Sequence, residues 1–257
     1  MSGRTLTVSR IGTMTFQGSL SIVQPVSFSI SQYSPASSVG NSGGDQCYDP
    51  ANVSVSRGVL NLTTTRPAAA FDCAGHSTRY RSGMVLTSGL FTQTYGRYEV
   101  RAKFPPGLGL QPAIWMLPQH PFRGPDYYYG EIDIAEAWGR YPGIVSPHLH
   151  YVSTPGTPQS GAYCTVQTSN SAFHTYAVEW TTTRMRFSYD GKTCWTTTWA
   201  PAPPFAPARA TSPAPFDQPF YLILNLGVGD STTRTNRPDA KTPFPARMQV
   251  DYVRVWK

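Results

Sequence analysis

Residues 97–104 read Arg-Tyr-Glu-Val-Arg-Ala-Lys-Phe, an unbroken alternation of polar and apolar side chains. Successive side chains of a β-strand point to opposite faces, so the four apolar residues share one face and the charged ones the other. Pro105-Pro106-Gly107 follows and ends the pattern. This stretch predicts a β-strand that buries one face.

The same period recurs along the chain. Val53 and Val55 precede the turn residues at 56–58, and Leu60 and Leu62 follow them, which predicts a hairpin. Further strands are predicted at residues 175–180, 184–189, 219–226 and 247–257, with Asp190-Gly191 as a hairpin turn. No window of 12 or more residues has a helical period.

The segments between these strands predict loops and no second domain. Residues 31–46 are rich in Ser and Gly, and residues 199–218 are rich in Pro and Ala. We find no internal repeat and no composition break. Many short strands separated by turns favour one all-β sandwich or barrel, with residues 1–257 as a single domain.

Composition excludes several classes of protein. With 40% apolar residues in 257, the chain can bury a core and is not expected to be disordered. Only 14% of residues are charged, against about 25% in ordinary soluble domains, which argues against a charged helical bundle. No run approaches the roughly 18 apolar residues of a membrane span, and the N-terminus lacks the apolar centre of a signal peptide.

The net charge is +7, from 21 Lys and Arg against 14 Asp and Glu. A basic balance can indicate an acidic partner such as nucleic acid or an acidic polymer. The basic residues are scattered singly, however, whereas nucleic-acid sites cluster their charge. We therefore expect neither a nucleic-acid nor a membrane partner.

Four cysteines form no C-x-x-C pair, so the spacing of a zinc or redox motif is missing. Three disulfide pairings are open, with four buried thiols as the alternative. We favour Cys47 with Cys73 and Cys164 with Cys194, because each pair is local and brackets a loop or hairpin. Disulfides would indicate an exported protein whose signal peptide is missing from this chain.

Residues 130–139 read Gly-Glu-Ile-Asp-Ile-Ala-Glu-Ala-Trp-Gly and hold three of the 14 acids within six residues. Glu131 and Asp133 share a strand face, whereas Glu136 would point the other way in a regular strand. A β-bulge around Ala135 would return Glu136 to the face of the other two. Ile132 and Ile134 would then face the core.

Three adjacent carboxylates raise at least one pKa, so that one carboxyl can keep its proton near neutral pH. Glycoside hydrolysis requires this combination of one ionised carboxylate and one protonated acid. Two other interpretations compete: a solvated edge strand that discourages aggregation, and a calcium site. Calcium loops usually draw their ligands from an irregular loop instead of an apolar-alternating strand.

This stretch resembles the bulged E-x-D-x-x-E signature of glycoside hydrolase family 16, in its laminarinase-like branch. From Cys47 to the C-terminus, further motifs resemble the family in the same order, whereas residues 1–46 show no clear match. These motifs are Tyr95-Gly96-Arg97-Tyr98-Glu99, Pro112-Ala113-Ile114-Trp115-Met116, Leu149-His150-Tyr151, Phe173-His174-Thr175-Tyr176, Leu224-Asn225-Leu226-Gly227 and Val250-Asp251-Tyr252-Val253.

The resemblance implies a concanavalin-like β-jelly roll of two antiparallel sheets with a concave substrate cleft. It implies that Glu131 is the nucleophile, Glu136 the acid/base and Asp133 the residue that assists the nucleophile. No organic cofactor is implied.

The resemblance also implies substrate-binding residues and a metal ligand. Trp115 is implied as a sugar platform, with a core position as the alternative, and Trp138 is a second candidate. His150 would lie across the cleft from Glu136, in reach of the sugar or a carboxylate. Arg81 and Asn225 are candidate sugar ligands, with packing or turn roles as alternatives. Asp251 occupies the place of a calcium ligand, or is an ordinary surface aspartate.

Two positions depart from the laminarinase pattern on the non-reducing side. Gln111 stands where many laminarinases carry tryptophan, and Gly43-Gly44 stand where they carry an Asn-Glu pair. We predict a secreted, monomeric, retaining endo-β-glucanase acting on β-1,3 or mixed β-1,3/1,4 glucan. The alternatives are an endo-hydrolase of galactans, a transglycosylase, a non-catalytic β-glucan-binding protein and a metal-dependent lectin.

Overall fold

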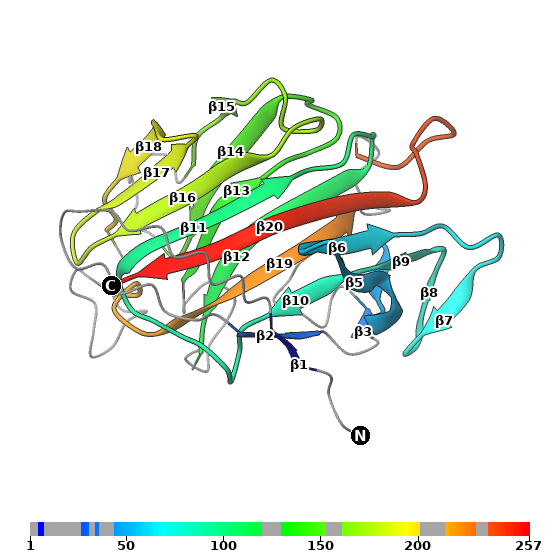
Figure 1. Ribbon diagram of the computed structural model, residues 1–257, viewed down its shortest axis with the longest axis horizontal. Helices are drawn as coiled ribbons and strands as arrows, with labels where there is room; N and C mark the ends of the chain where they lie inside the picture. The colour runs from blue at the N-terminus through cyan, green and yellow to red at the C-terminus, as the bar shows by residue number, and fades with distance from the viewer. Residues whose placement is uncertain are drawn as a thin grey trace.

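The computed structural model describes residues 44–119, 130–152, 161–200, 214–229 and 236–257, with short strands at 5–7, 27–30 and 34–35. Two large β-sheets make up most of this part of the chain, and Figure 1 shows their long strands overlaid in similar directions. Apart from the three-residue 3-10 helix η2 (Pro50–Asn52), the elements of the described chain are strands. The expectation of an all-β protein is confirmed.

The eight-stranded sheet carries the acidic stretch at residues 131–136. Its strands pair antiparallel. In spatial order they are β1 (Thr5–Thr7), β2 (Ser27–Ile30), β10 (Met84–Leu86), β19 (Phe220–Val228), β12 (Leu110–Pro118), β13 (Glu131–Glu136), β14 (Ile144–His150) and β15 (Cys164–Thr165).

The seven-stranded sheet packs against the first one. It is also antiparallel throughout. Its strands in spatial order are β18 (Lys192–Thr197), β17 (Met185–Tyr189), β16 (His174–Trp180), β11 (Gly96–Lys103), β20 (Ala246–Trp256), β6 (Val59–Thr64) and β5 (Val53–Ser56).

Two small sheets complete the described strands. One contains β3 (Ser34–Pro35), β4 (Gln46–Tyr48) and β9 (Tyr80–Ser82), and the other pairs β7 (Phe71–Cys73) with β8 (His76–Thr78). β3 lies in the segment that we predicted as a loop at residues 31–46, and most of the rest of that segment lies outside the described residues. Of the predicted loop at 199–218, residues 201–213 lie outside them as well.

The main hydrophobic core lies between the two large sheets. The alternation at residues 97–104 works as expected, since Tyr98, Val100, Ala102 and Phe104 are all buried in it. Ile132 and Ile134 enter the same core from the other sheet. Burying a side chain of this size is worth roughly 1.5–3 kcal/mol, so the alternation fixes which face of each strand is internal.

The turns that close the predicted hairpins have the required backbone geometry. Arg57 and Gly58 between β5 and β6 have φ angles of 52° and 77°, and Asp190 and Gly191 between β17 and β18 have 48° and 74°. Positive φ at both central residues is the signature of the tight turn that matches strand twist.

Both disulfides join the expected partners. Cys47 on β4 is bonded to Cys73 on β7, and Cys164 on β15 is bonded to Cys194 on β18. The second bond ties the edge strand of the eight-stranded sheet to the edge strand of the other sheet, beside the main core.

Candidate active site

A β-bulge in β13 brings the acidic side chains together. Opposite β13, Ile114 of β12 pairs with Ala135, and the next residue, Trp115, pairs with Asp133, so the register skips Ile134. The pairing with β14 shifts over the same residues, between Asp133 and Glu136. The predicted bulge is confirmed, and it restores Glu136 to the face of Asp133.

The backbone carbonyl of Ile134, in the bulge, accepts a hydrogen bond from the opposite sheet. The buried Tyr189 hydroxyl of β17 donates a 3.0 Å hydrogen bond to the backbone oxygen of Ile134. An extra residue in a strand leaves backbone groups unpaired, and a buried unpaired carbonyl is costly. Tyr189 therefore stabilises the bulge from beneath the acidic face.

Two histidines of β14 lie next to the carboxylates. His150 Nε2 is 3.1 Å from Asp133 Oδ2, and His148 Nδ1 is 3.3 Å from Glu136 Oε2. Glu131, Asp133 and His150 each place one polar atom within 4.8 Å of the others, and so do Asp133, Glu136 and His148. As expected, His150 is in reach of a carboxylate, but that carboxylate is Asp133. The register pairs His150 with Glu131 and Glu136 with Ser146, and the histidine beside the Glu136 carboxylate is His148.

Burial and mutual repulsion raise the pKa values of Glu131 and Asp133. Burial, followed by the charges of Asp133 and Glu136, raises the pKa of Glu131 to about 9. Burial and the nearby Glu136 charge also raise the pKa of Asp133 well above its usual range. Like charges this close cannot all be ionised, so the cluster retains a proton at neutral pH.

Glu136 has a polar neighbour at each carboxylate oxygen and accepts a hydrogen bond at one of them. Gln111 Nε2 on β12 donates to Oε1 at 3.0 Å, and His148 lies beside Oε2. Gln111, which the sequence marked only as a departure from the laminarinase pattern, thus contacts the carboxylate expected to be the acid/base. The hydrogen bond from Gln111 restricts the rotation of the Glu136 carboxylate.

Trp115 and Asn225 belong to a buried polar network beside the carboxylates. Trp115 Nε1 donates to Asn225 Oδ1 at 2.8 Å, and Asn225 Nδ2 donates to the Tyr48 hydroxyl at 3.0 Å. The same hydroxyl accepts from Gln46 Nε2 at 2.9 Å. Trp115 is only 4% exposed, so it lies in a packed cluster that also includes Tyr48, and its ring is not an open platform.

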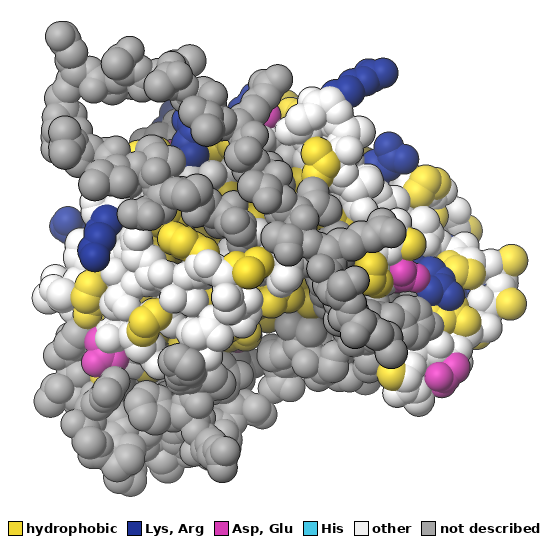
Figure 2. Space-filling view, turned by 60° about the horizontal axis from the view of Figure 1, so that its bottom comes forward, with side chains coloured by type: hydrophobic (Ala, Val, Ile, Leu, Met, Phe, Trp, Pro, Cys, Tyr) yellow, Lys and Arg dark blue, Asp and Glu magenta, His cyan; other side chains and the backbone are white. Residues whose placement is uncertain are grey.

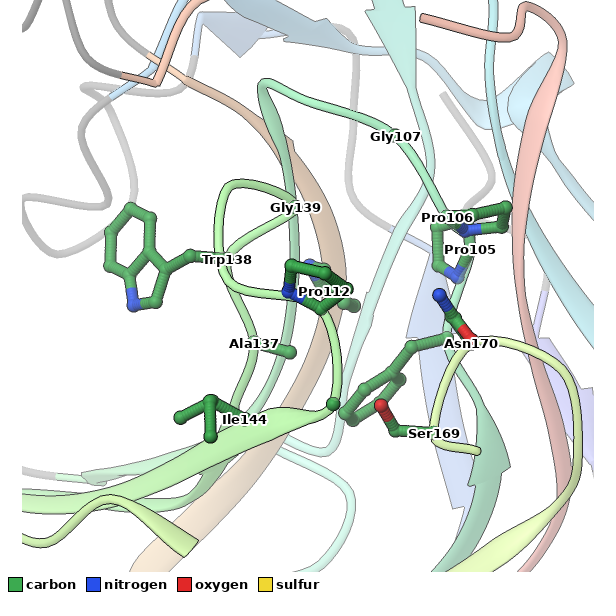
Figure 3. A pocket seen from close by; sticks show the side chains of 13 residues that line it. Pro105, Pro106, Gly107, Pro112, Ala137, Trp138, Gly139, Ile144, Ser169 and Asn170 are labelled. Atoms are coloured by element: carbon green, nitrogen blue, oxygen red, sulfur yellow. The ribbon is translucent and has the colours of Figure 1, made fainter. Parts of the chain in front are cut away.

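Trp138 and Arg81 have different surroundings. Trp138 follows β13 and lines a small open pocket, and Figure 3 shows its ring pointing away from Pro105, Pro106 and Asn170 on the other side. Arg81 on β9 forms an ion pair with Asp49 at 2.5 Å, and its guanidinium lies 4.0 Å from the centre of the Phe71 ring. These contacts match the packing role that we left open for Arg81.

The residues around Asp251 do not fit a calcium ion. The Asp251 carboxylate is ion-paired with Arg101 at 2.6 Å, and a guanidinium beside a carboxylate disfavours a second cation there. Within the described residues, the clusters of three His, Cys, Asp or Glu side chains that could hold a metal are the two carboxylate–histidine groups above, and Asp251 belongs to neither. We therefore assign no calcium to Asp251.

The other two glutamates, Glu99 and Glu179, form ion pairs on the seven-stranded sheet. Arg97 bridges Glu99 and Glu179 at 2.5 and 2.8 Å, and Arg186 pairs with Glu179 at 2.6 Å. On the face shown in Figure 2, the described Lys and Arg side chains lie in separate small groups. The part of that face that can be seen shows no basic stripe.

Sequence reasoning missed His148, Tyr189 and the contact of Gln111. A signal for His148 was present, because residues 148 and 150 are two apart and share one strand face. Tyr189 belongs to the opposite sheet, and local sequence carries no information about which carbonyl it meets.

The profile of "Glycosyl hydrolases family 16" matches residues 41–254. The chain belongs to this family. It is 38% identical to glucan endo-1,3-beta-glucosidase A1 of Niallia circulans over 215 residues, covering 80% of this chain and 31% of that protein. It is 39% identical to a beta-glucanase of Rhodothermus marinus over 189 residues, covering 69% of this chain and 63% of that protein.

Solved structures of the family share the fold. The laminarinase from Rhodothermus marinus superposes with a TM-score of 0.74 at 31% identity, covering 99% of this chain and 96% of that one. The β-jelly-roll expectation is confirmed by this likeness. The chain spans between about a third and two thirds of the length of the two curated relatives. Within the described residues, no helix has the length and apolarity needed to cross a bilayer.

Proposed function

We propose that this chain is the catalytic domain of a retaining endo-β-glucanase that hydrolyses β-1,3 or mixed β-1,3/1,4 glucan. The observation that carries the proposal is the bulged strand β13, which places Asp133 and Glu136 on one face with Glu131 beside Asp133. The names of the relatives, a glucan endo-1,3-beta-glucosidase and a beta-glucanase, supply the class of substrate.

Glu131 acts as the nucleophile and Glu136 as the acid/base. Glu136 gives its proton to the glycosidic oxygen while a Glu131 oxygen bonds to the anomeric carbon and the leaving sugar departs. Water then attacks the glycosyl ester, and Glu136 takes a proton from that water as the ester bond to Glu131 breaks. The configuration of the sugar is retained after the two displacements.

Asp133 can hold the proton of the cluster, which leaves Glu131 ionised for its role as the nucleophile. An attacking nucleophile must be ionised, yet the cluster keeps a proton at neutral pH. When Asp133 holds that proton, it can donate a hydrogen bond to an ionised Glu131. His150 Nε2 lies 3.1 Å from Asp133 Oδ2 and is the histidine next to this pair of carboxyls.

A screen of purified protein tests the substrate class. Laminarin and lichenan should release reducing ends, and the first product should carry the β-anomer by proton NMR. Glu131→Gln and Glu136→Gln should each lose about 10²-fold or more of turnover while retaining the wild-type circular dichroism spectrum. Full activity in either variant, or an α-anomer as first product, would overturn the assignment.

A galactan-degrading enzyme is the second candidate. Gln111 contacts Glu136 where many laminarinases have a tryptophan, so the surroundings of the acid/base differ from theirs. Agarose and carrageenan belong in the same screen, and activity on them without activity on glucans favours this candidate. Turnover of any of these polymers excludes a non-catalytic binding protein.

The two disulfides support secretion, because such bonds persist in oxidising compartments. We also propose that residues 1–257 act as one monomeric domain. Size-exclusion chromatography with light scattering tests this proposal, and a dimeric mass would contradict it.

A further inference from the structure

Tyr163 lies on the same side of the eight-stranded sheet as the carboxylates. It directly precedes β15, where Cys164 pairs with Val145 of β14 and packs against the main core. Because side chains alternate along an extended chain, Tyr163 faces away from that core. Its ring lies 6.4 Å from the His148 ring in an edge-on arrangement, which places it at the acidic face.

Tyr163 ends a row of contacts that crosses three strands, β12, β13 and β14, to the residue just before β15. Gln111 donates to Glu136, Glu136 lies 3.3 Å from His148, and His148 meets Tyr163. The row runs through Glu136, the residue that protonates the leaving oxygen in the proposed function. Tyr163 is 70% exposed, the most exposed of the large hydrophobic side chains in the described chain.

The position of Tyr163 is fixed by its neighbours. Cys164 is held by the disulfide to Cys194. Gly161 forms a bridge with His148, and a Cβ at this glycine would overlap His148 Cδ2 and Nε2. Only glycine lets the chain approach this imidazole so closely. The backbone that carries the exposed ring is therefore held in place beside His148.

The opposite side of the carboxylates is already filled. Tyr48 and Trp115 are packed together there, with Asn225 bound to both. An exposed aromatic ring can cover the apolar C–H face of a pyranose at little conformational cost. Among the described residues, the β14–β15 side thus presents an open stacking surface to a sugar beyond Glu136.

We propose that Tyr163 and His148 form a binding subsite for the leaving sugar of a β-glucan, with the Tyr163 ring as the stacking platform. This inference rests on the proposed function and extends it to the leaving-group side. His148 forms the wall between this subsite and the acid/base.

Two β-1,3-glucosyl substrates that differ in the leaving group test the subsite. A β-1,3-glucan polymer fills it, whereas a β-glycosyl fluoride of the β-1,3-linked glucose disaccharide has a leaving group that cannot stack. Tyr163→Ala should lower kcat/KM for the polymer about tenfold and leave fluoride release unchanged. Tyr163→Phe should retain polymer activity. Transfer to an added β-1,3-glucan oligosaccharide, which must bind on this side, should fall with Tyr163→Ala.

The matched control is Tyr252→Ala, on β20 of the other sheet, where the Tyr252 hydroxyl contacts Glu99. It should leave both substrates unaffected. Unchanged polymer activity in a folded Tyr163→Ala protein overturns the inference, and so does an equal loss on polymer and fluoride. Wild-type protein that is inactive on every glucan refutes the proposed function and this inference together, which separates the two kinds of failure.

Discussion

The Tyr189 hydroxyl reaches across the core and donates to the carbonyl of Ile134, 3.0 Å away in the bulge of β13. One sheet thereby supports the irregularity that aligns the carboxylates of the other. Tyr189 is far from the acidic stretch in sequence and touches none of its side chains in this contact. Its effect on the site passes through the backbone of Ile134.

Tyr189→Phe removes this donor and leaves a buried carbonyl without its partner. We expect a loss of about 1–3 kcal/mol in the free energy of unfolding, measured by urea denaturation. We also expect kcat to fall more than KM rises, because the bulge positions Glu136. Tyr176→Phe is the matched control, since the buried Tyr176 hydroxyl has no hydrogen-bond partner among the described residues. Equal behaviour of the two variants would contradict the role of Tyr189.

The stability of the protein should fall as pH rises across the titration of Glu131. Burial and neighbouring charges raise its pKa in the folded protein from 4.5 to about 9, and that of the adjacent Asp133 is raised as well. The Glu131–Asp133 pair of the native state therefore keeps a proton that the unfolded chain has released, on Glu131 or, in the reactive form, on Asp133. Between pH 4.5 and about 9, the free energy of unfolding therefore decreases as the pH rises, by at most about 1.4 kcal/mol per pH unit.

Glu131→Gln should flatten this slope, as followed by melting temperature between pH 5 and 9. Glu179→Gln, which removes a carboxylate ion-paired on the other sheet, should leave the slope as it is in wild type. An unchanged slope in Glu131→Gln would show that this carboxyl does not hold the proton.

Gln111→Ala removes a donor from the Glu136 carboxylate. A hydrogen bond to a charged group is worth about 1.5–3 kcal/mol, so we expect kcat to fall about tenfold or more with a smaller change in KM. Steady-state kinetics on the best polymer checks this. Gln249→Ala, whose amide bonds to Asn61 on the seven-stranded sheet, should behave as wild type. A change in KM alone would assign Gln111 to substrate binding.

The Cys47–Cys73 disulfide should stabilise both the fold and the network around Trp115. It closes a loop with a sequence separation of 26, for which the chain-entropy argument gives about 3 kcal/mol. Replacing both cysteines by serine should lower stability by that order and raise KM, because Tyr48 adjoins Cys47. A stability loss without any kinetic change would confine the role of this bond to folding.

Much of the fold was predictable because its information is local. The alternation at residues 97–104 follows from the period of a strand, and the turns at Arg57-Gly58 and Asp190-Gly191 follow from the φ angles those residues tolerate. The disulfide pairs were predictable for the same reason, since each brackets a short segment. The bulge in β13 was predictable because its three acids could share a face only with one extra residue.

The sequence by itself determined the strands, the turns and the presence of Glu131, Asp133 and Glu136 on one face. Only the tertiary structure decided that His148 and Gln111 contact Glu136, that His150 contacts Asp133, and that Trp115 is buried. The period of a strand fixes the face of a side chain. The register between strands and the packing between sheets fix its neighbours, and these depend on segments far apart in the chain.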